Sequence, residues 1–262
     1  MMKARKISNL PQTVERALDI LETFVGSKSP LGITEISQRV ELNKSTTYRI
    51  LQALLKRGYV HQDSKTNKYQ LSHMILRISG TILNENKLRE VTRGYLIELS
   101  QKTYQTAQLS ILENKEIVII DQTEGKDILR LALKVGQRGP LHCTASGKAI
   151  LAFLNRDEFK NILHNYSFIA LTPKTITSIK LLNDQLGKIR ENGYSFCNGE
   201  YHKDVRAVGA PIFGMERNVL GSIVLTLPYI RMKLTEVAGY GELVKKAGLE
   251  ISEKLGYRVV KE

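Results

Sequence analysis

The chain has 262 residues, 42% of them hydrophobic and 25% charged, a composition that argues against a disordered protein and allows one large or two modest domains. Its formal net charge of +13 is consistent with a polyanionic partner, and the first 80 residues, with 13 Lys and Arg against 6 Asp and Glu, are the most densely basic part. Two cysteines and no apolar stretch of membrane-spanning length exclude a disulfide scaffold and a membrane protein, so we expect an unprocessed cytoplasmic chain.

The first predicted helix is marked by apolar residues that recur every three to four positions, the spacing of a helix with one buried face. They are Val14, Ala17, Leu18, Leu21 and Phe24. A loop at 26–32, rich in glycine, serine and proline, follows the helix. Thr34 is then expected to cap a short second helix, whose Ile36 and Val40 point inward.

The third predicted helix runs from about Lys44 to Arg57 and follows the second after only residues 41–43. Such a short connection forces two helices into a steep crossing, as in a helix-turn-helix. Its apolar face carries Ile50, Leu51, Leu54 and Leu55, and its polar face carries Ser45, Thr46, Arg49, Gln52 and Lys56, flanked by Thr47 and Tyr48. The polar face is predicted to enter a groove of DNA.

The residue types on this polar face suit DNA. Small hydroxyl groups at the start of the helix allow close approach to phosphates and base edges, and Arg49 one turn later can donate two hydrogen bonds to a guanine. Lys56 lies too late in the helix to read bases and is expected to hold a phosphate. The predicted DNA-binding residues are Lys44, Ser45, Thr46, Thr47, Arg49, Gln52, Lys56 and Lys65.

Two short predicted strands, 58–61 and 68–71, flank a polar turn at 62–67 and form a wing. Any amphipathic helix has a polar face, so the third helix alone leaves its contact with DNA open. However, three helices, a tight turn and a wing carrying Lys65 and Lys68 occur in the order that a winged helix needs, and in the most basic part of the chain. This order favours a DNA-binding domain.

The chain after the wing changes from helical to mixed periodicity. Apolar patterns in 71–80 and from Leu88 through Val91, Tyr95 and Leu99 predict helices that link the domains and pack against a dimer partner. Strands are then predicted at 107–112, 117–121, 128–133, 194–197, 205–213 and 219–227, with helices near Asp157 and Lys180 and at 235–255. This mixture indicates an α+β domain.

Three segments of the first domain resemble the IclR family of transcriptional regulators: TVERALDILE at 13–22, LNKSTTYRIL at 42–51 and GYV at 58–60. The similarity continues past the wing and covers nearly the whole chain. It implies an α+β fold in which an N-terminal winged helix-turn-helix is joined by a linker helix to a GAF-like effector-binding domain. The implied boundaries are 1–71 for the DNA-binding domain, 72–87 for the linker helix and 88–262 for the effector-binding domain.

Two segments of the second domain extend the resemblance. Residues 136–149 are similar to the effector-pocket loop of the family, where small residues let backbone amides approach a ligand. Residues 193–213 are similar to a second family motif, in which Glu200, Ala207 and Pro211 stand at the expected positions. The resemblance implies pocket walls at Ile128, Leu131, Gly139, Ala145, Ser146, Cys197, Ala207, Val224 and Thr226.

Two positions depart from the family pattern. Cys197 stands where the family usually has Asp or Ser, and Gly214 where it has Asp or Asn. The first of these positions belongs to the pocket, which is therefore expected to be less polar than in better-known relatives. Because a buried polar group without a partner costs about 1 to 3 kcal/mol, we expect an effector with a sizeable apolar or aromatic part.

Three alternatives concern the segment around Ser146. A P-loop would need glycine at 142 and Ser or Thr at 149, where the chain has His142 and Ala149. Ser146 with His142 as base lacks the Gly-x-Ser-x-Gly turn of a nucleophilic serine. Metal-site spacing is missing among the candidate soft ligands His142, Cys143, Cys197 and His202. We therefore expect no catalytic residue, no metal and no cofactor.

Together these features predict a DNA-binding transcriptional regulator, taken to be a repressor, whose operator binding is modulated by a small-molecule effector. A homodimer or tetramer would place two recognition helices in successive major grooves of a near-palindromic, double-stranded site, about 34 Å or a multiple of it apart. No membrane association is expected. Two alternatives stay open: a ligand-sensing module that acts through protein contacts, and an uncharacterised enzyme.

Overall fold

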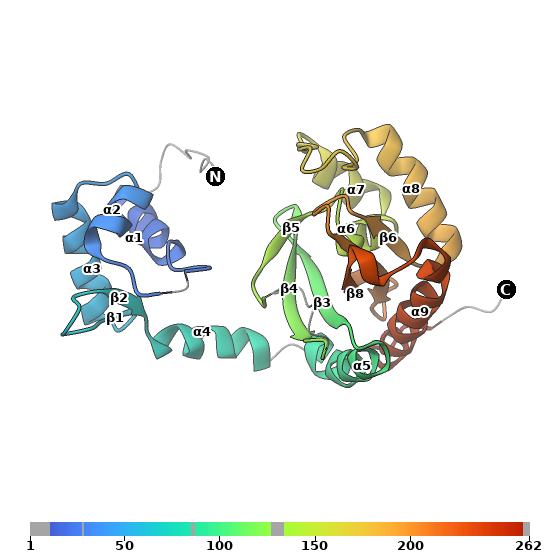
Figure 1. Cartoon of the computed structure of the whole chain (residues 1–262), viewed down its shortest axis with the longest axis horizontal. Coiled ribbons are helices and arrows are strands. Elements are labelled where there is room, and N and C mark those ends of the chain that lie inside the picture. Colours follow the sequence, from blue (N-terminus) through green and yellow to red (C-terminus); the bar gives the residue numbers. More distant parts are fainter. Residues whose placement is uncertain (1–10, 28, 85–86, 127–133, 259–262) are drawn as a thin grey trace. The chain divides into compact units, whose positions relative to one another are not determined.

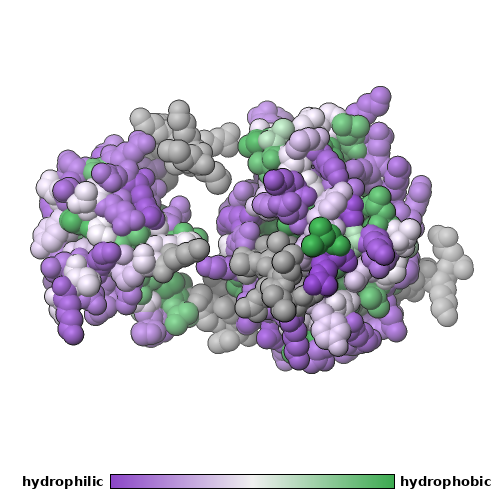
Figure 2. Space-filling view, viewed as in Figure 1, coloured by the Kyte–Doolittle hydropathy of each residue, from purple (hydrophilic) through white to green (hydrophobic). Residues whose placement is uncertain are grey.

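The computed structural model describes residues 11–27, 29–84, 87–126 and 134–258 (Figure 1). The chain divides into two compact units, residues 1–85 and 86–262, and each is described by itself. No helix in the described ranges is long and apolar enough to cross a bilayer. Hydrophilic side chains cover most of the surface visible in Figure 2, with apolar patches scattered between them.

The first unit is a small helical domain with a β-hairpin. Its elements are α1 (Gln12–Glu22), α2 (Ile33–Arg39), α3 (Lys44–Lys56), β1 (Val60–Gln62), β2 (Tyr69–Leu71) and α4 (His73–Asn84). The strands pair antiparallel, with Val60 opposite Leu71. A second bridge joins Leu31 to Tyr69, so the hairpin is held against the loop before α2. The predicted winged helix-turn-helix is therefore confirmed as a fold.

The core of the first unit differs from the prediction in the face that α1 buries. Ile20 is completely buried, whereas Val14 and Leu18 are 55% and 54% exposed, although both were expected inside. The apolar residues of α1 fit helical spacing on either of two overlapping faces. Contact with α3 selects the face that carries Ala17 and Ile20, and only the folded domain determines this choice.

The cap of α2 also differs from the prediction, and the cap of α3 is seen only in the structure. α2 begins at Ile33 after Gly32, which provides no side-chain cap, so the prediction that Thr34 caps it is wrong. α3 is capped by Asn43, whose side-chain oxygen accepts the backbone N–H of Thr46 at 2.8 Å. A side-chain acceptor at this position satisfies one of the N–H groups that a helix leaves free at its start.

The second unit is built on one antiparallel sheet. Its strands are β3 (Thr106–Glu113), β4 (Glu116–Thr123), β5 (Arg138–Pro140), β6 (Ser195–Asn198), β7 (Val205–Phe213) and β8 (Val219–Pro228). They lie in the order β5-β4-β3-β8-β7-β6. The helices are α5 (Lys87–Thr103), α6 (Ala145–Leu151), α7 (Arg156–Leu163), α8 (Ile179–Asn192) and α9 (Val237–Lys254), with single turns of 3₁₀ helix at Tyr229–Arg231 and Leu234–Glu236. The predicted α+β class is confirmed.

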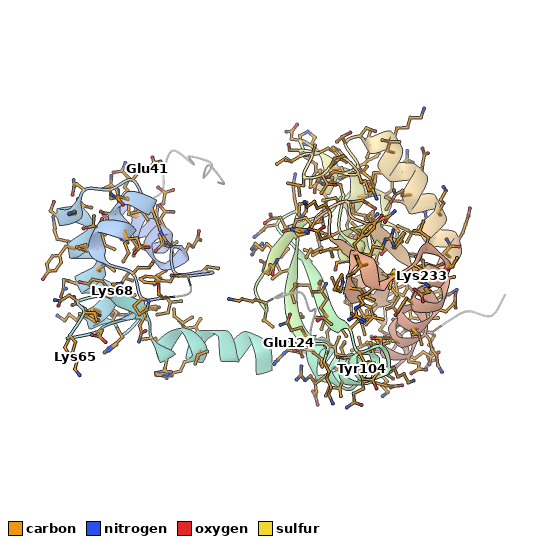
Figure 3. The ribbon with its side chains drawn as sticks, in the orientation of Figure 1. Glu41, Lys65, Lys68, Tyr104, Glu124 and Lys233 are labelled. Atoms are coloured by element: carbon orange, nitrogen blue, oxygen red, sulfur yellow. The ribbon has the colours of Figure 1, made fainter. Side chains whose placement is uncertain are left out.

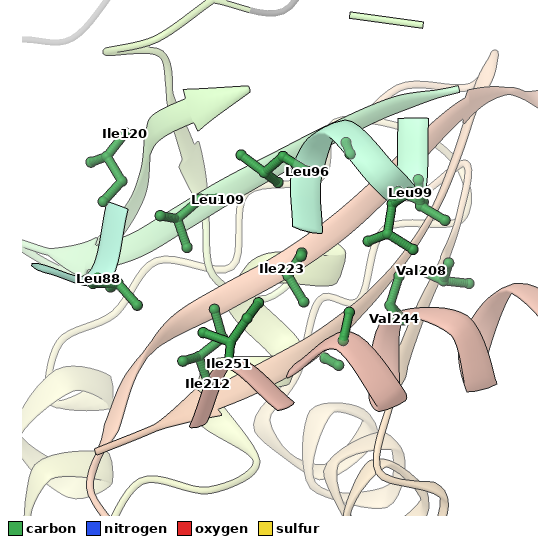
Figure 4. Close-up of a cluster of buried hydrophobic side chains, with 14 of the residues drawn as sticks. Leu88, Leu96, Leu99, Leu109, Ile120, Val208, Ile212, Ile223, Val244 and Ile251 are labelled. Atoms are coloured by element: carbon green, nitrogen blue, oxygen red, sulfur yellow. The ribbon is translucent and has the colours of Figure 1, made fainter. Parts of the chain in front are cut away.

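Helices cover both faces of this sheet. On one face, α5 and α9 pack against a core that includes Leu96, Leu109, Ile223 and Val244 (Figure 4). On the other face, α6 packs against β7 and β8, and a second cluster forms around Leu141, Ile150, Leu182 and Leu186. Residues alternate between the two faces of a strand, so each strand contributes to both layers.

Three predictions for this unit need comment. α5 was expected to pack against a dimer partner, but its Leu96 and Leu99 are buried against the sheet of the same chain. The segment that was expected to be a pocket loop contains α6, a buried helix capped by the Thr144 hydroxyl, which accepts the N–H of Gly147 at 3.1 Å. The strand predicted at 128–133 lies outside the described residues.

Candidate functional site

The exposed surface of α3 carries most of the residues that were predicted to bind DNA. Lys44, Ser45, Arg49 and Lys56 are exposed, and Thr46 and Gln52 are half-buried. The Ser45 hydroxyl donates to the side-chain oxygen of Asn43 at 2.9 Å, so it belongs to the cap of the helix. Arg49 lies one turn further on and forms no ion pair with any described residue.

Thr47 is the exception on this helix. Its side chain is completely buried, and its hydroxyl donates to the backbone oxygen of Asn43 at 3.1 Å. Adjacent residues of a helix are turned by about 100° from one another, so Thr46 and Thr47 cannot both face outward with Arg49. The prediction that Thr47 contacts DNA is therefore wrong.

The wing exposes Lys65 and Lys68 to solvent, and Lys65 lies at the outer tip of the hairpin (Figure 3). The carboxylate of Asp63 accepts the backbone N–H groups of Lys65 and Thr66, each at 2.8 Å. These hydrogen bonds lower the pKa of Asp63 below its usual value. The side chain of Asp63 therefore stabilises the turn that positions Lys65.

A cavity of about 500 Å³ lies in the second unit between the sheet and α6. Of the nine predicted pocket residues, the described part of its lining includes Gly139, Ala145, Ser146, Cys197, Ala207, Val224 and Thr226. The other two, Ile128 and Leu131, lie outside the described residues. Ser146 and Thr226, which are 80 positions apart in the chain, thus line the same cavity.

Strand alternation explains which side chains reach this cavity. On β8, Ile223 packs into the core below α9, while its neighbour Val224 lines the cavity. On β3, Leu109 belongs to the same core and Gln108 lines the cavity. Gln108 was missed in the sequence, although a glutamine inside an otherwise apolar strand is the type of signal that marks a polar site.

Several polar groups of the cavity have partners within the protein, whereas the Oε1 atom of Gln108 has none among the described residues. The side-chain amide of Gln108 donates to the Thr226 hydroxyl at 2.9 Å, and the Ser146 hydroxyl donates to that of Ser110 at 3.2 Å. Arg138 at the rim forms ion pairs with Glu113 and, at 3.6 Å, with Glu116. The described lining therefore offers few unpaired charges to a ligand.

Cys197 adds to the apolar character of this wall, and Cys143 contacts it from outside the described lining. Both are buried, and the Cys197 thiol donates to the backbone oxygen of Cys143 at 3.2 Å. Burial raises the pKa of the Cys143 thiol to about 12 and also raises that of Cys197. Both side chains are therefore neutral thiols, which are poor nucleophiles and poor metal ligands. No group of three metal-ligating side chains was found within the described ranges.

Behind this wall, a buried ion pair fixes α6 to the end of β6. The Lys148 ammonium group lies 2.7 and 2.8 Å from the two carboxylate oxygens of Glu200. It also donates to the backbone oxygen of Phe196 at 2.6 Å and to Gln185 at 2.7 Å. The Lys148 side chain is completely buried, so these acceptors replace its entire hydration.

A second buried network holds the segment that ends at Leu171, another cavity-lining residue. The Tyr166 hydroxyl accepts the N–H of Leu141 and lies 2.9 Å from Nδ1 of His142, while Nε2 of His142 lies 3.2 Å from the backbone oxygen of Ile169. A carbonyl oxygen can only accept, so Nε2 carries the proton and Nδ1 accepts from Tyr166. Burial lowers the pKa of His142, which keeps the ring neutral.

Comparison with known proteins agrees with both halves of this description. Residues 13–64 match the family model of the IclR helix-turn-helix domain, and residues 80–253 match that of the bacterial transcriptional regulator IclR C-terminal domain. The chain is 35% identical to the HTH-type transcriptional regulator XynR of Escherichia coli, over 94% of this chain and 98% of the relative. It is 33% identical to the HTH-type transcriptional regulator KdgR of the same organism, over 94% and 95%.

The fold is also found among solved structures. The crystal structure of the Thermotoga maritima IclR superposes with a TM-score of 0.79 at 27% sequence identity. The superposition covers 94% of this chain and 99% of that protein, so it includes both units.

Proposed function

This chain belongs to the IclR family of bacterial transcriptional regulators. We propose that it is a repressor whose affinity for DNA is controlled by a small molecule in the cavity of its second unit. The family gives it a DNA-binding helix-turn-helix and an effector-binding C-terminal domain. Repression is the simpler direction of control, because a protein seated on a promoter excludes other proteins sterically and needs no further contact surface. Such a protein acts in the cytoplasm.

On the DNA side, the proposal depends on the N-terminal half of α3. Ser45 and Thr46 lie at the start of the helix, and Arg49 has an exposed guanidinium group that pairs with no carboxylate in the described part of the chain. Lys44, Gln52, Lys56 and Lys65 complete the proposed contact surface. We propose that a dimer or tetramer binds a near-palindromic duplex through two copies of this surface.

On the effector side, the observation that carries the proposal is the cavity of about 500 Å³ beside the α6 wall, a volume that suits a small molecule. The proposed binding residues are Gly139, Ala145, Ser146, Cys197, Ala207, Val224 and Thr226, together with Ile128 and Leu131. Their side chains are small or apolar, and the hydroxyl of Thr226 is already paired with Gln108. We propose a ligand with an apolar or aromatic body and few charged groups.

Control of DNA binding follows from linkage. A ligand changes the affinity for DNA only if it binds the two arrangements of the protein with different affinities, and the ratio of those affinities limits the change. The N-terminal end of α6 lines the cavity with Ala145 and Ser146, and the Lys148–Glu200 pair joins this helix to the end of β6. We therefore propose that a ligand acts by favouring one position of α6 over another.

The test combines two measurements on the full chain. A thermal-shift screen of aromatic and aliphatic acids, alcohols and sugars finds the ligand, because binding to the native state raises Tm. Fluorescence anisotropy on a duplex selected from random DNA then measures affinity with and without that ligand. Arg49→Ala is expected to cost about 1 to 3 kcal/mol at selected base pairs.

The matched control for Arg49→Ala is Lys180→Ala, which removes one exposed positive charge from α8 of the second unit. Sequence-specific binding that survives Arg49→Ala, or binding that does not respond to salt, would contradict the DNA-reading role of α3 and favour a module that acts through protein contacts. A screen in which only small hydroxy or keto acids raise Tm would contradict the proposed ligand class. Activation of transcription by the bound protein would contradict repression.

A further inference from the structure

A groove of about 470 Å³ runs between α1 and α3 of the first unit. Its floor is apolar and is formed by Ala17, Ile50, Ala53 and Leu54. Three arginines line it: Arg16 from α1, Arg49 from α3, and Arg57, the residue that follows the C-terminal end of α3. Neither Arg16 nor Arg57 belongs to the contact surface that the sequence predicted.

The charge of this groove is not neutralised by its surroundings. Among the described residues, its lining includes no aspartate or glutamate, and none of the three guanidinium groups forms an ion pair. By contrast, Arg39 on α2 is paired with Glu35 at 2.8 Å. The hydroxyl groups of Thr13 and Thr46 also line the groove. Unpaired guanidinium groups and hydroxyls are the side-chain groups that bind phosphate oxygens.

The groove adjoins the surface of α3 that we propose reads DNA. Arg49 belongs to both, so the groove is the direct continuation of that surface toward α1. A helix with its side chains is about 10 to 12 Å wide, and the major groove of DNA is about 12 Å wide. When α3 enters the major groove, the phosphates of the two strands must therefore lie along its two sides.

We propose that the α1–α3 groove binds the phosphate backbone beside the bases that α3 reads, with Arg16 and Arg57 as phosphate-binding residues. This inference rests on the proposed DNA-binding role of α3. Arg57 lies eight residues after Arg49, about 12 Å along the helix, so it can reach a phosphate while Arg49 contacts the bases. Arg16 and Arg57 thus position the protein on the duplex without carrying sequence information.

The number of phosphates bound is measured by the salt dependence of affinity. Each phosphate neutralised contributes about 0.9 to the slope of log affinity against log salt. Removing one contact per bound protomer should therefore flatten the slope by about 0.9 for each protomer, or about 1.8 for a bound dimer. Between 50 and 200 mM salt, the wild-type dimer would lose about 12 times more affinity than the variant for that reason.

The experiment compares Arg16→Gln, Arg57→Gln, Arg49→Ala and the control Lys180→Gln, which removes one exposed charge from α8 in the second unit. Each full-length variant is titrated onto a selected duplex and a scrambled duplex at several salt concentrations, after its thermal unfolding is shown to match the wild type. Arg16→Gln and Arg57→Gln are expected to flatten the slope on both duplexes and to leave the preference between them unchanged. Lys180→Gln is expected to change neither.

Different failures have different meanings. If the slopes of Arg16→Gln and Arg57→Gln equal those of wild type and control while Arg49→Ala loses the preference for the selected duplex, the groove does not bind phosphate and the proposed function stands. If Arg49→Ala keeps that preference, α3 does not read DNA and both proposals fall. If Arg16→Gln alters the oligomeric state in sedimentation without altering the slope, a second copy of the chain occupies the groove.

Discussion

Replacing Lys148 with methionine should strongly destabilise the second unit. The substitution keeps the length of the side chain but removes the ammonium group that donates to Glu200, Phe196 and Gln185. The Glu200 side chain is only 6% exposed, so its carboxylate would stay buried without a counter-ion. Breaking a buried pair from one side costs about 3 to 5 kcal/mol.

This cost should appear as a lower Tm. In a domain of about 150 to 250 residues, 1 kcal/mol shifts Tm by roughly 2 to 4 °C, so Lys148→Met should lower it by about 6 to 20 °C. The double variant Lys148→Met, Glu200→Gln should recover part of the loss, because the amide carries no charge. Scanning calorimetry of both variants and of the exposed control Lys180→Met gives the comparison.

Two results would refute this reasoning about the ion pair. One is a loss below about 1 kcal/mol for Lys148→Met, which would mean that water reaches the carboxylate of Glu200. The other is a double variant no more stable than the single one, which would mean that the lost stability came from packing around the lysine stem and not from the unpaired charge.

Three further outcomes follow from the contacts described above. The folded-state pKa of His142 lies below its unfolded value near 6.5, so the neutral ring contributes stability at higher pH that is lost as pH falls. The difference in unfolding free energy between wild type and His142→Asn, measured by urea unfolding, should therefore shrink from pH 7.5 to 5.5. A difference that stays constant over this range would contradict this. In anisotropy titrations, Thr47→Val should leave DNA affinity unchanged within about twofold, whereas Arg49→Ala should weaken binding by about 1 to 3 kcal/mol. If both substitutions weaken binding equally, Thr47 contacts DNA after all. Burial raises the pKa of both thiols, and raises that of Cys143 to about 12. Labelling by a disulfide reagent at pH 7.5 should therefore be far slower in the native protein than in urea. Rapid labelling of the native protein would show that the cavity wall opens.

Much of the fold could be predicted from local patterns, because long segments such as β7 and β8 have clear apolar periodicity and turns at their ends. The same patterns fail for α6, whose seven residues are all buried, since a helix without an exposed face shows no amphipathic period. They also cannot choose between Thr46 and Thr47, because the choice depends on how α3 packs in its domain.

The candidate site was harder to predict where it depends on distant pairing. Lys148 and Glu200 are 52 residues apart, and their contact exists only because α6 packs against β6. Gln108 reaches the cavity because β3 pairs with β8, which brings Gln108 to Thr226 across 118 residues. The predicted pocket walls came from the family resemblance, which encodes such pairings, and not from the spacing of residues within one element.

The alternation of side chains along β3 and β8 has a consequence for how regulators of this type diversify. Leu109 and Ile223 hold the core beneath α5 and α9, while Gln108 and Val224, their immediate neighbours, face the cavity. Mutations at every second position can therefore alter which metabolite is recognised while the intervening positions continue to maintain the fold. Such a sheet lets new ligand preferences arise by single substitutions from a stable ancestor.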